Sequence, residues 1–419
     1  MSDLPATSLA FAFVQAARID AAVFAGQSLA DGLLARVDAV ARPAVRDLVY
    51  GSLRCYGRGD FFLSRLLATP LPAEEVRALL LVAIHRLETR PEAVHTVVDQ
   101  AVAAAGELAE GRFRGLVNGV LRNFLRQQEA LRVAVATDVV AQAQHPGWWL
   151  ARLQKAWPGD WQAIVAAGNA PPPMALRVNR RRSTRDEYLS RLAAEGIVAT
   201  PVGEVGLALA KPIPVERLPG FAAGLVSVQD PGAQLAATLL DPLPGSRVLD
   251  ACAAPGGKTA HLLERAELDL LALDVKAARC RRVAENLTRL GLHAALQAAD
   301  CARLDTWWDG RPFDAVLADV ACTASGVVRR NPDSKWLRRE ADIAGFAAAQ
   351  SRILDALWRV VRRGGKLLYA TCSVFPEENG EQIDHFVANR PDARRAHEEQ
   401  ILPAAAHDGF YYCLLEKHA

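Results

Sequence analysis

The chain has 419 residues, of which 51% are hydrophobic and 23% are charged, and its formal net charge is +2. This length is too great for a single hydrophobic core and predicts two or three domains. The small net charge excludes a polycationic nucleic-acid binder, so any nucleic-acid surface has to be local.

The sequence carries no sign of a membrane or export segment. No apolar run reaches the roughly 18 residues that a membrane span needs, and the opening residues, Met1–Pro5, lack the basic start of a signal peptide. The seven cysteines form no Cys-x-x-Cys pair and have no histidine at metal spacing, which predicts neither a metal site nor a disulfide framework. We expect a cytoplasmic protein without a membrane partner.

Residues 1–140 are expected to form an all-helical domain. Apolar residues recur at helical spacing in Leu79–Leu87 and Val97–Ala105, without strand-like alternation. A last helix near Phe113–Arg126 leaves Arg122 and Arg126 off its apolar stripe. This basic face is either a nucleic-acid contact or an ordinary solvated face, and the pattern alone does not decide.

Residues 141–225 are expected to hold linker helices and a small α+β insert. Prolines interrupt the helices at His145–Trp149, Trp157–Gly159 and Pro171–Pro173. A strand-like run at Met174–Asn179 follows, then the basic triplet Arg180–Arg182 and a helix. The triplet fits either a contact with a phosphate backbone or a solvated loop, and both interpretations stay open.

Residues 226–419 alternate short apolar runs with helical segments, which predicts an α/β domain with a doubly wound parallel sheet. Ligands of such sheets bind at the carboxyl ends of the strands. The expected strands are Arg247–Ala251, Asp269–Leu273, Ala294–Gln297, Asp314–Ala318, Lys366–Ala370 and a final antiparallel strand at Phe410–Leu415.

The segment after the first of these strands predicts a cofactor loop. Gly256 and Gly257 allow a tight turn, and the helix that opens near Thr259 favours negative charge at its N-terminus. The spacing is neither that of a dinucleotide fingerprint nor that of a phosphate loop, and such glycines can also be purely structural. The candidate cofactor residues of the loop are Cys252, Ala253, Ala254, Pro255, Gly256, Gly257 and Lys258.

Three aspartates follow later strands of the same sheet. Asp274 stands where an acidic side chain commonly accepts hydrogen bonds from ribose hydroxyls, which favours a nucleoside cofactor. Asp300 is placed to accept from an adenine amino group, and Asp319 is expected on the reaction side. A capping or solvated aspartate is the alternative for each of them.

Two cysteines, Cys322 and Cys372, follow the fourth and fifth strands, and adjacent strands would bring them into one crevice. A thiol near cations loses its proton readily and becomes a nucleophile. Carbon 5 of a pyrimidine needs such chemistry, because a thiolate must add to carbon 6, with an acid at N3, before carbon 5 can accept a methyl group. The candidate cations are Lys258, Arg329, Arg330 and Lys335, and the sequence does not choose between them.

Several long motifs resemble known proteins. Asp250–Thr259, Phe313–Asp319, Ser325–Trp336 and Tyr369–Asn379 are similar to the RNA 5-methylcytosine methyltransferases of the NOP2/Sun family. The helical front with Gly115–Asn123 resembles the NusB-like RNA-binding domain, which narrows the resemblance to family members that act on the bacterial small ribosomal subunit. The resemblance implies a NusB-like all-α domain, an RRM-like α+β insert and a Rossmann-like class I methyltransferase domain.

The resemblance also implies a role for each candidate residue. Cys372 would be the nucleophile that forms an adduct with carbon 6 of a cytosine in 16S ribosomal RNA, and Cys322 would promote release of the product. Asp319 would contact both the base and the methionine end of the cofactor, S-adenosylmethionine. The rest of the cofactor would be held by Cys252–Lys258, Asp274 and Asp300. No obligate protein partner is implied, and without the resemblance either thiol could be the nucleophile.

One departure from the family pattern concerns the second thiol. The Asp-Ala-Pro-Cys of the family is here Asp319-Val-Ala-Cys322, so Ala321 replaces a proline and its fixed φ is lost. We expect looser placement of Cys322 and slower product release, with methyl transfer intact.

Two readings from other classes stand beside an active methyltransferase. A NusB-like front fits an RNA-binding protein whose rear domain no longer catalyses, and the α/β half fits a nicotinamide oxidoreductase less well because its loop lacks the glycine pattern. A measurement of cofactor binding distinguishes them: the methyltransferase binds S-adenosylmethionine, the RNA-binding protein binds neither cofactor, and the oxidoreductase binds NAD.

Overall fold

The computed structural model describes residues 4–418. The chain divides into two compact units. The first, here called the helical unit, contains the chain up to Asn169 together with Val328–Glu340. The second, the sheet unit, contains Ala170–Val327 and the chain from Ala341 onward. No helix of the described residues combines the length and the apolar character that crossing a membrane requires.

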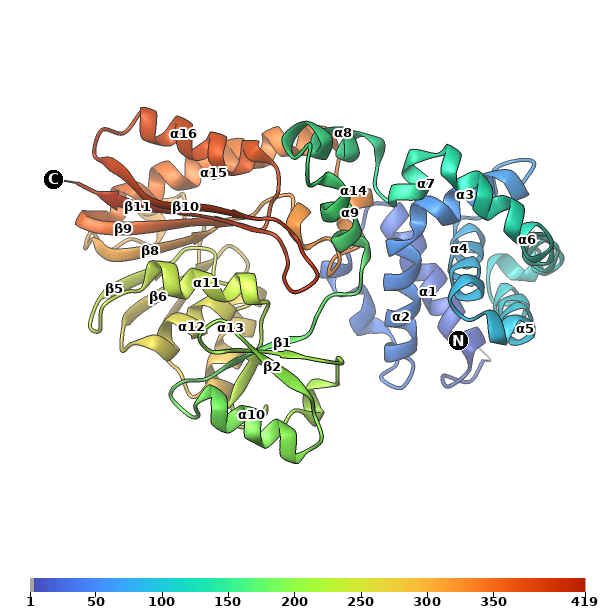
Figure 1. Cartoon of the computed structure of the whole chain (residues 1–419), viewed down its shortest axis with the longest axis horizontal. Coiled ribbons are helices and arrows are strands. Elements are labelled where there is room, and N and C mark those ends of the chain that lie inside the picture. Colours follow the sequence, from blue (N-terminus) through green and yellow to red (C-terminus); the bar gives the residue numbers. More distant parts are fainter. Residues whose placement is uncertain (1–3, 419) are drawn as a thin grey trace. The chain divides into compact units, whose positions relative to one another are not determined.

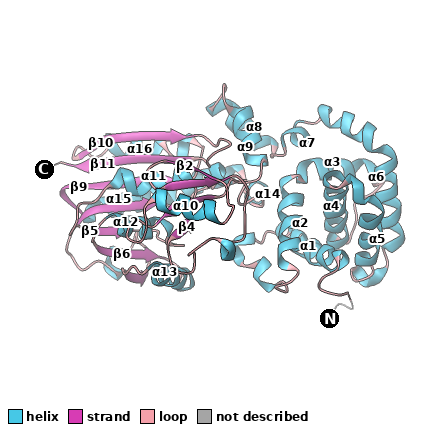
Figure 2. Cartoon of the chain, turned by 60° about the horizontal axis from the view of Figure 1, so that its bottom comes forward, coloured by secondary structure: helices cyan, strands magenta, loops and turns pink. Residues whose placement is uncertain are grey.

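The described residues of the helical unit form helices and loops (Figure 2), as the spacing of apolar residues predicts. The central helix, α4, packs against α1, α2, α3, α5 and α6, and its middle is buried on every side because residues 78–84 are all apolar. The helices of this unit are α1 (Leu9–Phe24), α2 (Arg42–Arg54), α3 (Tyr56–Leu66), α4 (Glu74–Thr89), α5 (Val94–Ala105), α6 (Arg114–Ala134), α7 (Val139–Ala143), α8 (Gly147–Ala156), α9 (Trp161–Asn169) and α14 (Ser334–Leu337).

The segment Val328–Glu340 is built into the helical unit by buried polar contacts. The Lys335 ammonium, fully buried, donates to the carbonyl oxygens of Arg54 at 3.2 Å and Gln144 at 2.7 Å and to Oδ1 of Asn169 at 2.9 Å. The neighbouring indole of Trp336 donates to a carbonyl of α2 at 2.7 Å. Burial lowers the pKa of Lys335 to about 7, and a buried amine needs hydrogen-bond partners in either protonation state, so the unit is complete only when this segment is in place.

The sheet unit contains a small antiparallel sheet with the order β2-β3-β1-β4, against which α10 packs. Its elements are β1 (Ala175–Val178), α10 (Arg185–Ala194), β2 (Ala199–Val202), β3 (Gly206–Leu209) and β4 (Val226–Val228). Leu176 and Val178 of β1 share a core with Tyr188 and Leu192 of α10. This is the predicted α+β insert.

The large sheet of the same unit has the order β10-β11-β9-β8-β5-β6-β7. The strands from β9 to β7 are parallel, and β11 and β10 run antiparallel at one side. The elements are α11 (Pro231–Leu240), β5 (Arg247–Asp250), α12 (Gly257–Arg265), β6 (Asp269–Asp274), α13 (Ala277–Leu290), β7 (Ala295–Ala298), β8 (Phe313–Asp319), α15 (Glu340–Val360), β9 (Val361–Thr371), α16 (Gly380–Ala388), β10 (Ala393–Ile401) and β11 (Phe410–Lys417).

Helices cover both faces of this sheet (Figure 1), as a doubly wound fold requires. Val316 and Leu367 belong to the core shared with α15 and α16, whereas their neighbours Leu317 and Leu368 belong to the core shared with α11, α12 and α13. Successive side chains of a strand point to opposite faces of the sheet. Because both faces of these strands are buried, their sequences are continuous apolar runs. The Rossmann-like prediction is confirmed.

One strand of the large sheet has no counterpart among the strands predicted for it. β10 lies at the edge of the large sheet, and its sequence, Ala-Arg-Arg-Ala-His-Glu-Glu-Gln-Ile, is largely polar. Most of its side chains are exposed or half-buried. Charged side chains are usual on an edge strand because they discourage pairing with other chains, and they remove the apolar signal by which a strand is recognised.

Candidate active site

The carboxyl ends of four parallel strands bring the candidate residues to one edge of the sheet. β9, β8, β5 and β6 are neighbours in that order. Asp250, Asp274 and Asp319 are the last residues of β5, β6 and β8, and Cys372 follows the end of β9. Cys322 lies three residues beyond β8. This edge is where open α/β sheets bind their ligands.

The glycine loop is held in the shape that a cofactor cradle needs. Gly256 has a φ of +95°, a conformation that favours glycine, and a Cβ there would also lie in tight contact, 3.1 Å from Cγ1 of Val283. The loop is fixed to β6 by a hydrogen bond of 2.8 Å from Ala253 N to the Leu273 carbonyl. α12 begins at Gly257, and the free N–H groups of its first turn favour a negative ligand.

The side chain of Asp250 lies buried beneath this loop. Its Oδ2 accepts a hydrogen bond of 2.6 Å from Thr259, while its Oδ1 has no hydrogen-bond partner among the described residues. Burial raises the pKa of Asp250 to about 7, the Thr259 bond opposes this, and the charge of Asp319 adds to it. A buried acceptor without a partner fits a cationic ligand group.

The two other expected cofactor aspartates differ in their surroundings. Asp274 is almost fully buried and already engaged: its carboxylate lies 3.4 Å from the Arg279 guanidinium and accepts from Lys276 N at 3.1 Å. Asp300 is exposed and lies two residues beyond the end of β7, where its Oδ1 accepts from Ala302 N at 3.0 Å. Asp274 is therefore fixed in place, whereas Asp300 remains open to a ligand.

Lys258 and Asp319 form an ion pair of 2.5 Å between Nζ and Oδ2. Burial lowers the pKa of Lys258, but the charges of Asp319, Cys372 and Asp250 outweigh this and raise the pKa above its ordinary value. Lys258 thus stays charged, and it lies near enough to Cys372 for the two groups to interact electrostatically. Of the four candidate cations, the other three, Arg329, Arg330 and Lys335, belong to the segment built into the helical unit.

The two thiols lie in contact, with 3.4 Å between the Sγ atoms of Cys322 and Cys372. Cys322 is buried and Cys372 half-buried. The hydrogen bond with Cys372, followed by burial, raises the pKa of Cys322 well above its ordinary value, so this thiol keeps its proton at neutral pH. Ala321, which precedes Cys322, is held through its carbonyl oxygen by Gln350 Nε2 at 2.9 Å.

Two buried charged residues at this edge were not predicted. Arg177 on β1 forms two 2.8 Å bonds with the carboxylate of Glu264 on α12 and donates to the Gly257 carbonyl at 2.7 Å. Glu378 accepts hydrogen bonds from the loops that carry both thiols. The only sequence signals were an arginine inside an apolar strand and a second glutamate in the motif that ends at Asn379.

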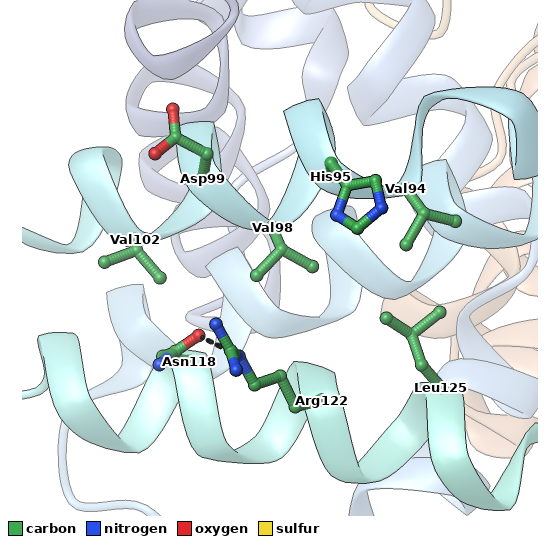
Figure 3. A pocket seen from close by; sticks show the side chains of 8 residues that line it. All are labelled: Val94, His95, Val98, Asp99, Val102, Asn118, Arg122 and Leu125. Atoms are coloured by element: carbon green, nitrogen blue, oxygen red, sulfur yellow. Dashed lines mark hydrogen bonds between the residues drawn. The ribbon is translucent and has the colours of Figure 1, made fainter.

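The arginines considered as a nucleic-acid surface fall into two groups. In the triplet, Arg180 pairs with Glu204 at 2.6 Å, Arg181 pairs with Glu267, and Arg182 donates to a backbone carbonyl. Arg122 and Arg126 donate to asparagines and form no ion pair with any described residue. Arg122 lines a hollow of about 420 Å³ between α5 and α6 (Figure 3). The arginines of α6 are therefore more available for contact with an RNA phosphate than those of the triplet.

Three sequence families match successive parts of the chain. The NusB family matches residues 10–126, the ferredoxin-like domain of the RsmF/B-like methyltransferases matches residues 145–216, and the 16S rRNA methyltransferase RsmB/F family matches residues 237–416.

Curated relatives match over nearly the full length. The chain is 44% identical to the ribosomal RNA small subunit methyltransferase B of Pseudomonas syringae pv. tomato, over 96% of this chain and 96% of the relative. It is also 44% identical to the protein of the same name from Vibrio cholerae, over 94% of each chain.

Solved structures agree in fold. The crystal structure of PH0851 covers 99% of this chain and all of its own with a TM-score of 0.83 at 22% identity. A methyltransferase homologue from Pyrococcus horikoshii covers 66% of this chain and 97% of its own with a TM-score of 0.59 at 27% identity. A third structure, NSun6 from Pyrococcus horikoshii with SFG, covers 65% of this chain and 98% of its own with a TM-score of 0.58 at 19% identity.

Proposed function

The chain belongs to the family of ribosomal RNA small subunit methyltransferase B, and we propose that it methylates carbon 5 of a cytosine in 16S ribosomal RNA with S-adenosylmethionine as methyl donor. The observation that carries the proposal is the contact of 3.4 Å between the two thiols. Methylation of a ring nitrogen or a hydroxyl needs no thiol, whereas the weakly nucleophilic carbon 5 has to be activated by one.

The glycine loop is the proposed cofactor site. Cys252–Lys258, Asp274 and Asp300 would hold S-adenosylmethionine, with Asp319 at its methionine end. The positive N-terminus of α12 suits the carboxylate of the cofactor, and the unpartnered Oδ1 of Asp250 suits its ammonium group. When bound, the cofactor supplies an electrophilic methyl group.

Cys372 is the proposed nucleophile. In the proposed step, its thiolate adds to carbon 6 so that a sulfur–carbon bond forms, with the charged Lys258 nearby. The electron pair of the ring double bond then moves toward N3, where the Lys258–Asp319 pair can present a proton. Carbon 5 becomes an enamine carbon that can accept a methyl group.

Cys322 is the proposed partner in product release. After methylation, the bond between Cys372 and carbon 6 breaks, Cys322 gives its proton to the departing sulfur, and the resulting Cys322 thiolate takes the proton of carbon 5, so that the aromatic ring is restored. Cys322 retains its proton because of its raised pKa, and at 3.4 Å it can donate to the departing sulfur. The target cytosine has to be unstacked for these groups to reach it, so a loop or a flipped base is expected.

The test compares the wild type with Cys372→Ala and Cys322→Ala, using unmodified small-subunit RNA and cofactor labelled in the methyl group. Cys372→Ala should transfer no label. Cys322→Ala should accumulate a protein–RNA adduct that survives a denaturing gel, because release is blocked after the bond to carbon 6 has formed. Full transfer by Cys372→Ala would overturn the assignment, and an adduct formed only by Cys372→Ala would reverse the two roles.

A further inference from the structure

The residue that follows each thiol leads into one buried polar cluster, called here the Glu378 cluster. None of its members exposes more than 2% of its surface. They come from the loop after Cys322, the loop after Cys372, the turn Pro376–Glu378 and α15. The members are Thr323, Ser325, Gln350, Ser373 and Glu378.

The carboxylate of Glu378 joins the two thiol loops. Its Oε2 accepts hydrogen bonds of 2.5 Å from the hydroxyls of both Thr323 and Ser373. Its Oε1 accepts from the backbone N–H of Thr323 at 2.9 Å and from Gln350 Nε2 at 3.2 Å. Since Thr323 directly follows Cys322 and Ser373 directly follows Cys372, one side chain fixes the backbone next to both sulfurs.

The cluster also reaches the other side of Cys322. Gln350 donates from the same Nε2 to the carbonyl of Ala321 at 2.9 Å, so Cys322 is flanked on both sides by residues tied to Glu378. Burial raises the pKa of Glu378, and the hydrogen bonds from Ser373, Thr323 and Gln350 oppose that shift. Four donors bind the carboxylate of Glu378 and leave it little freedom to move.

We propose that Glu378 is a positioning residue that sets the distance between the two thiols. The proposal rests on the proposed function, because this distance matters for the reaction only if both cysteines act. Four further links join the loops without Glu378. Gly326 N donates to the Cys372 carbonyl and Val374 N donates to Ser325 Oγ, each at 2.8 Å. The Ser373 hydroxyl also lies 3.2 Å from that of Thr323 and 3.0 Å from that of Ser325. We therefore expect removal of Glu378 to leave the loops attached and to loosen the placement of the two thiols relative to each other.

The experiment measures the thiol distance separately from activity. Diamide oxidises two adjacent thiols to one disulfide and is itself reduced to the hydrazine, and peptide mass spectrometry follows the Cys322–Cys372 product. The sulfurs must approach from 3.4 Å to about 2.05 Å, so the rate reports their placement. The variants are Glu378→Ala, Glu378→Gln, which keeps the shape of the side chain, and Thr323→Val, which removes the hydroxyl that bonds Glu378, Ser325 and Ser373. The exposed Glu381→Gln on α16 is the control.

We expect Glu378→Ala to slow both disulfide formation and single-turnover methyl transfer by about 10-fold or more, since a displacement near 1 Å can cost about 100-fold. Glu378→Gln should retain most of both rates, Thr323→Val should lie between them, and Glu381→Gln should match the wild type. The dissociation constant for S-adenosylmethionine should stay within about twofold in each variant, because the cluster does not touch the glycine loop.

Three results would decide against parts of this scheme. Unchanged disulfide and methylation rates in folded Glu378→Ala and Thr323→Val would overturn the positioning role. Weakened cofactor binding in parallel with slower methylation would show general damage to the fold and would also overturn it. Slower disulfide formation with unchanged methylation would support the role of Glu378 in thiol placement and would contradict the two-cysteine mechanism.

Discussion

Replacement of Arg177 by methionine tests the link between the small sheet and the glycine loop. The guanidinium of Arg177 is completely buried, and the carboxylate of its partner Glu264 is 1% exposed. Besides the two bonds to Glu264, Arg177 donates to the carbonyl of Gly257 at 2.7 Å and to Gln229 Oε1 at 2.6 Å. The Arg177→Met variant leaves three buried acceptor groups without this donor.

The expected loss is large because the pair is buried. Removing one member of a buried ion pair typically costs about 3–5 kcal/mol, since the other charge is left uncompensated. Domains are commonly stable by only about 5–15 kcal/mol, so Arg177→Met should lower the free energy of unfolding of the sheet unit severely. The double variant Arg177→Met/Glu264→Leu removes both charges and should be about 2–4 kcal/mol more stable than the sum of the single effects.

Urea denaturation followed by tryptophan fluorescence measures these changes, with cofactor affinity as a second readout because Gly257 begins α12. The matched control is Arg181→Met. Its partner, Glu267, is 84% exposed, so this change should cost less than about 1 kcal/mol. A loss for Arg177→Met as small as that of the control, or single effects that simply add in the double variant, would refute the reasoning.

Three further outcomes are expected. Burial raises the pKa of Asp250 from 3.8 to about 7, so the stability that Asp250 contributes is fully present below its unfolded pKa and is lost as the pH rises through 7. Relative to Asp250→Asn, the free energy of unfolding of the cofactor-free wild type should therefore fall by up to about 4 kcal/mol between about pH 4 and about pH 8, measured by urea titration. A difference between the two proteins that does not change with pH would contradict this. Ala321→Pro should restore the fixed backbone angle before Cys322 and speed multiple turnover by about two- to fivefold, without changing the single-turnover rate. Proline should be tolerated there because the Ala321 N–H donates no hydrogen bond to any described residue. A faster single turnover would place the effect on methyl transfer instead of product release. The double variant Arg122→Gln/Arg126→Gln should reduce the slope of log affinity for single-stranded RNA against log salt concentration by about 1.4. Arg180→Gln should change this slope little, because Arg180 is already paired with Glu204. Equal effects of the two sets of changes would argue against RNA binding by α6.

The strands of the large sheet were predictable wherever both faces are buried. β5, β6 and β8 are apolar runs that end at Asp250, Asp274 and Asp319, so each run and its boundary are visible in the sequence. The carboxyl ends of parallel strands lie at one edge of the sheet, so the residues that follow these strands could be predicted to lie close together without any other information. The polar edge strand β10 lacks this signal and escaped prediction.

The supporting residues of the site were not predictable from spacing. Glu378 meets Thr323 across 55 positions, and Arg177 meets Glu264 across 87. Neither separation corresponds to a helical or strand period, so only the folded chain brings these groups together. The pairing of Lys258 with Asp319 was unpredictable for the same reason, because it spans 61 positions.

The placement of Val328–Glu340 in the helical unit has a consequence for the order in which the protein folds during synthesis. The carbonyl groups of Arg54 and Gln144 emerge from the ribosome long before Lys335, which binds them. At about 5–20 residues per second, the interval between Asn169 and the end of this segment lasts roughly ten to thirty seconds. The front of the protein therefore remains unfinished, with those carbonyl groups hydrated, until most of the sheet unit up to β8 has been translated.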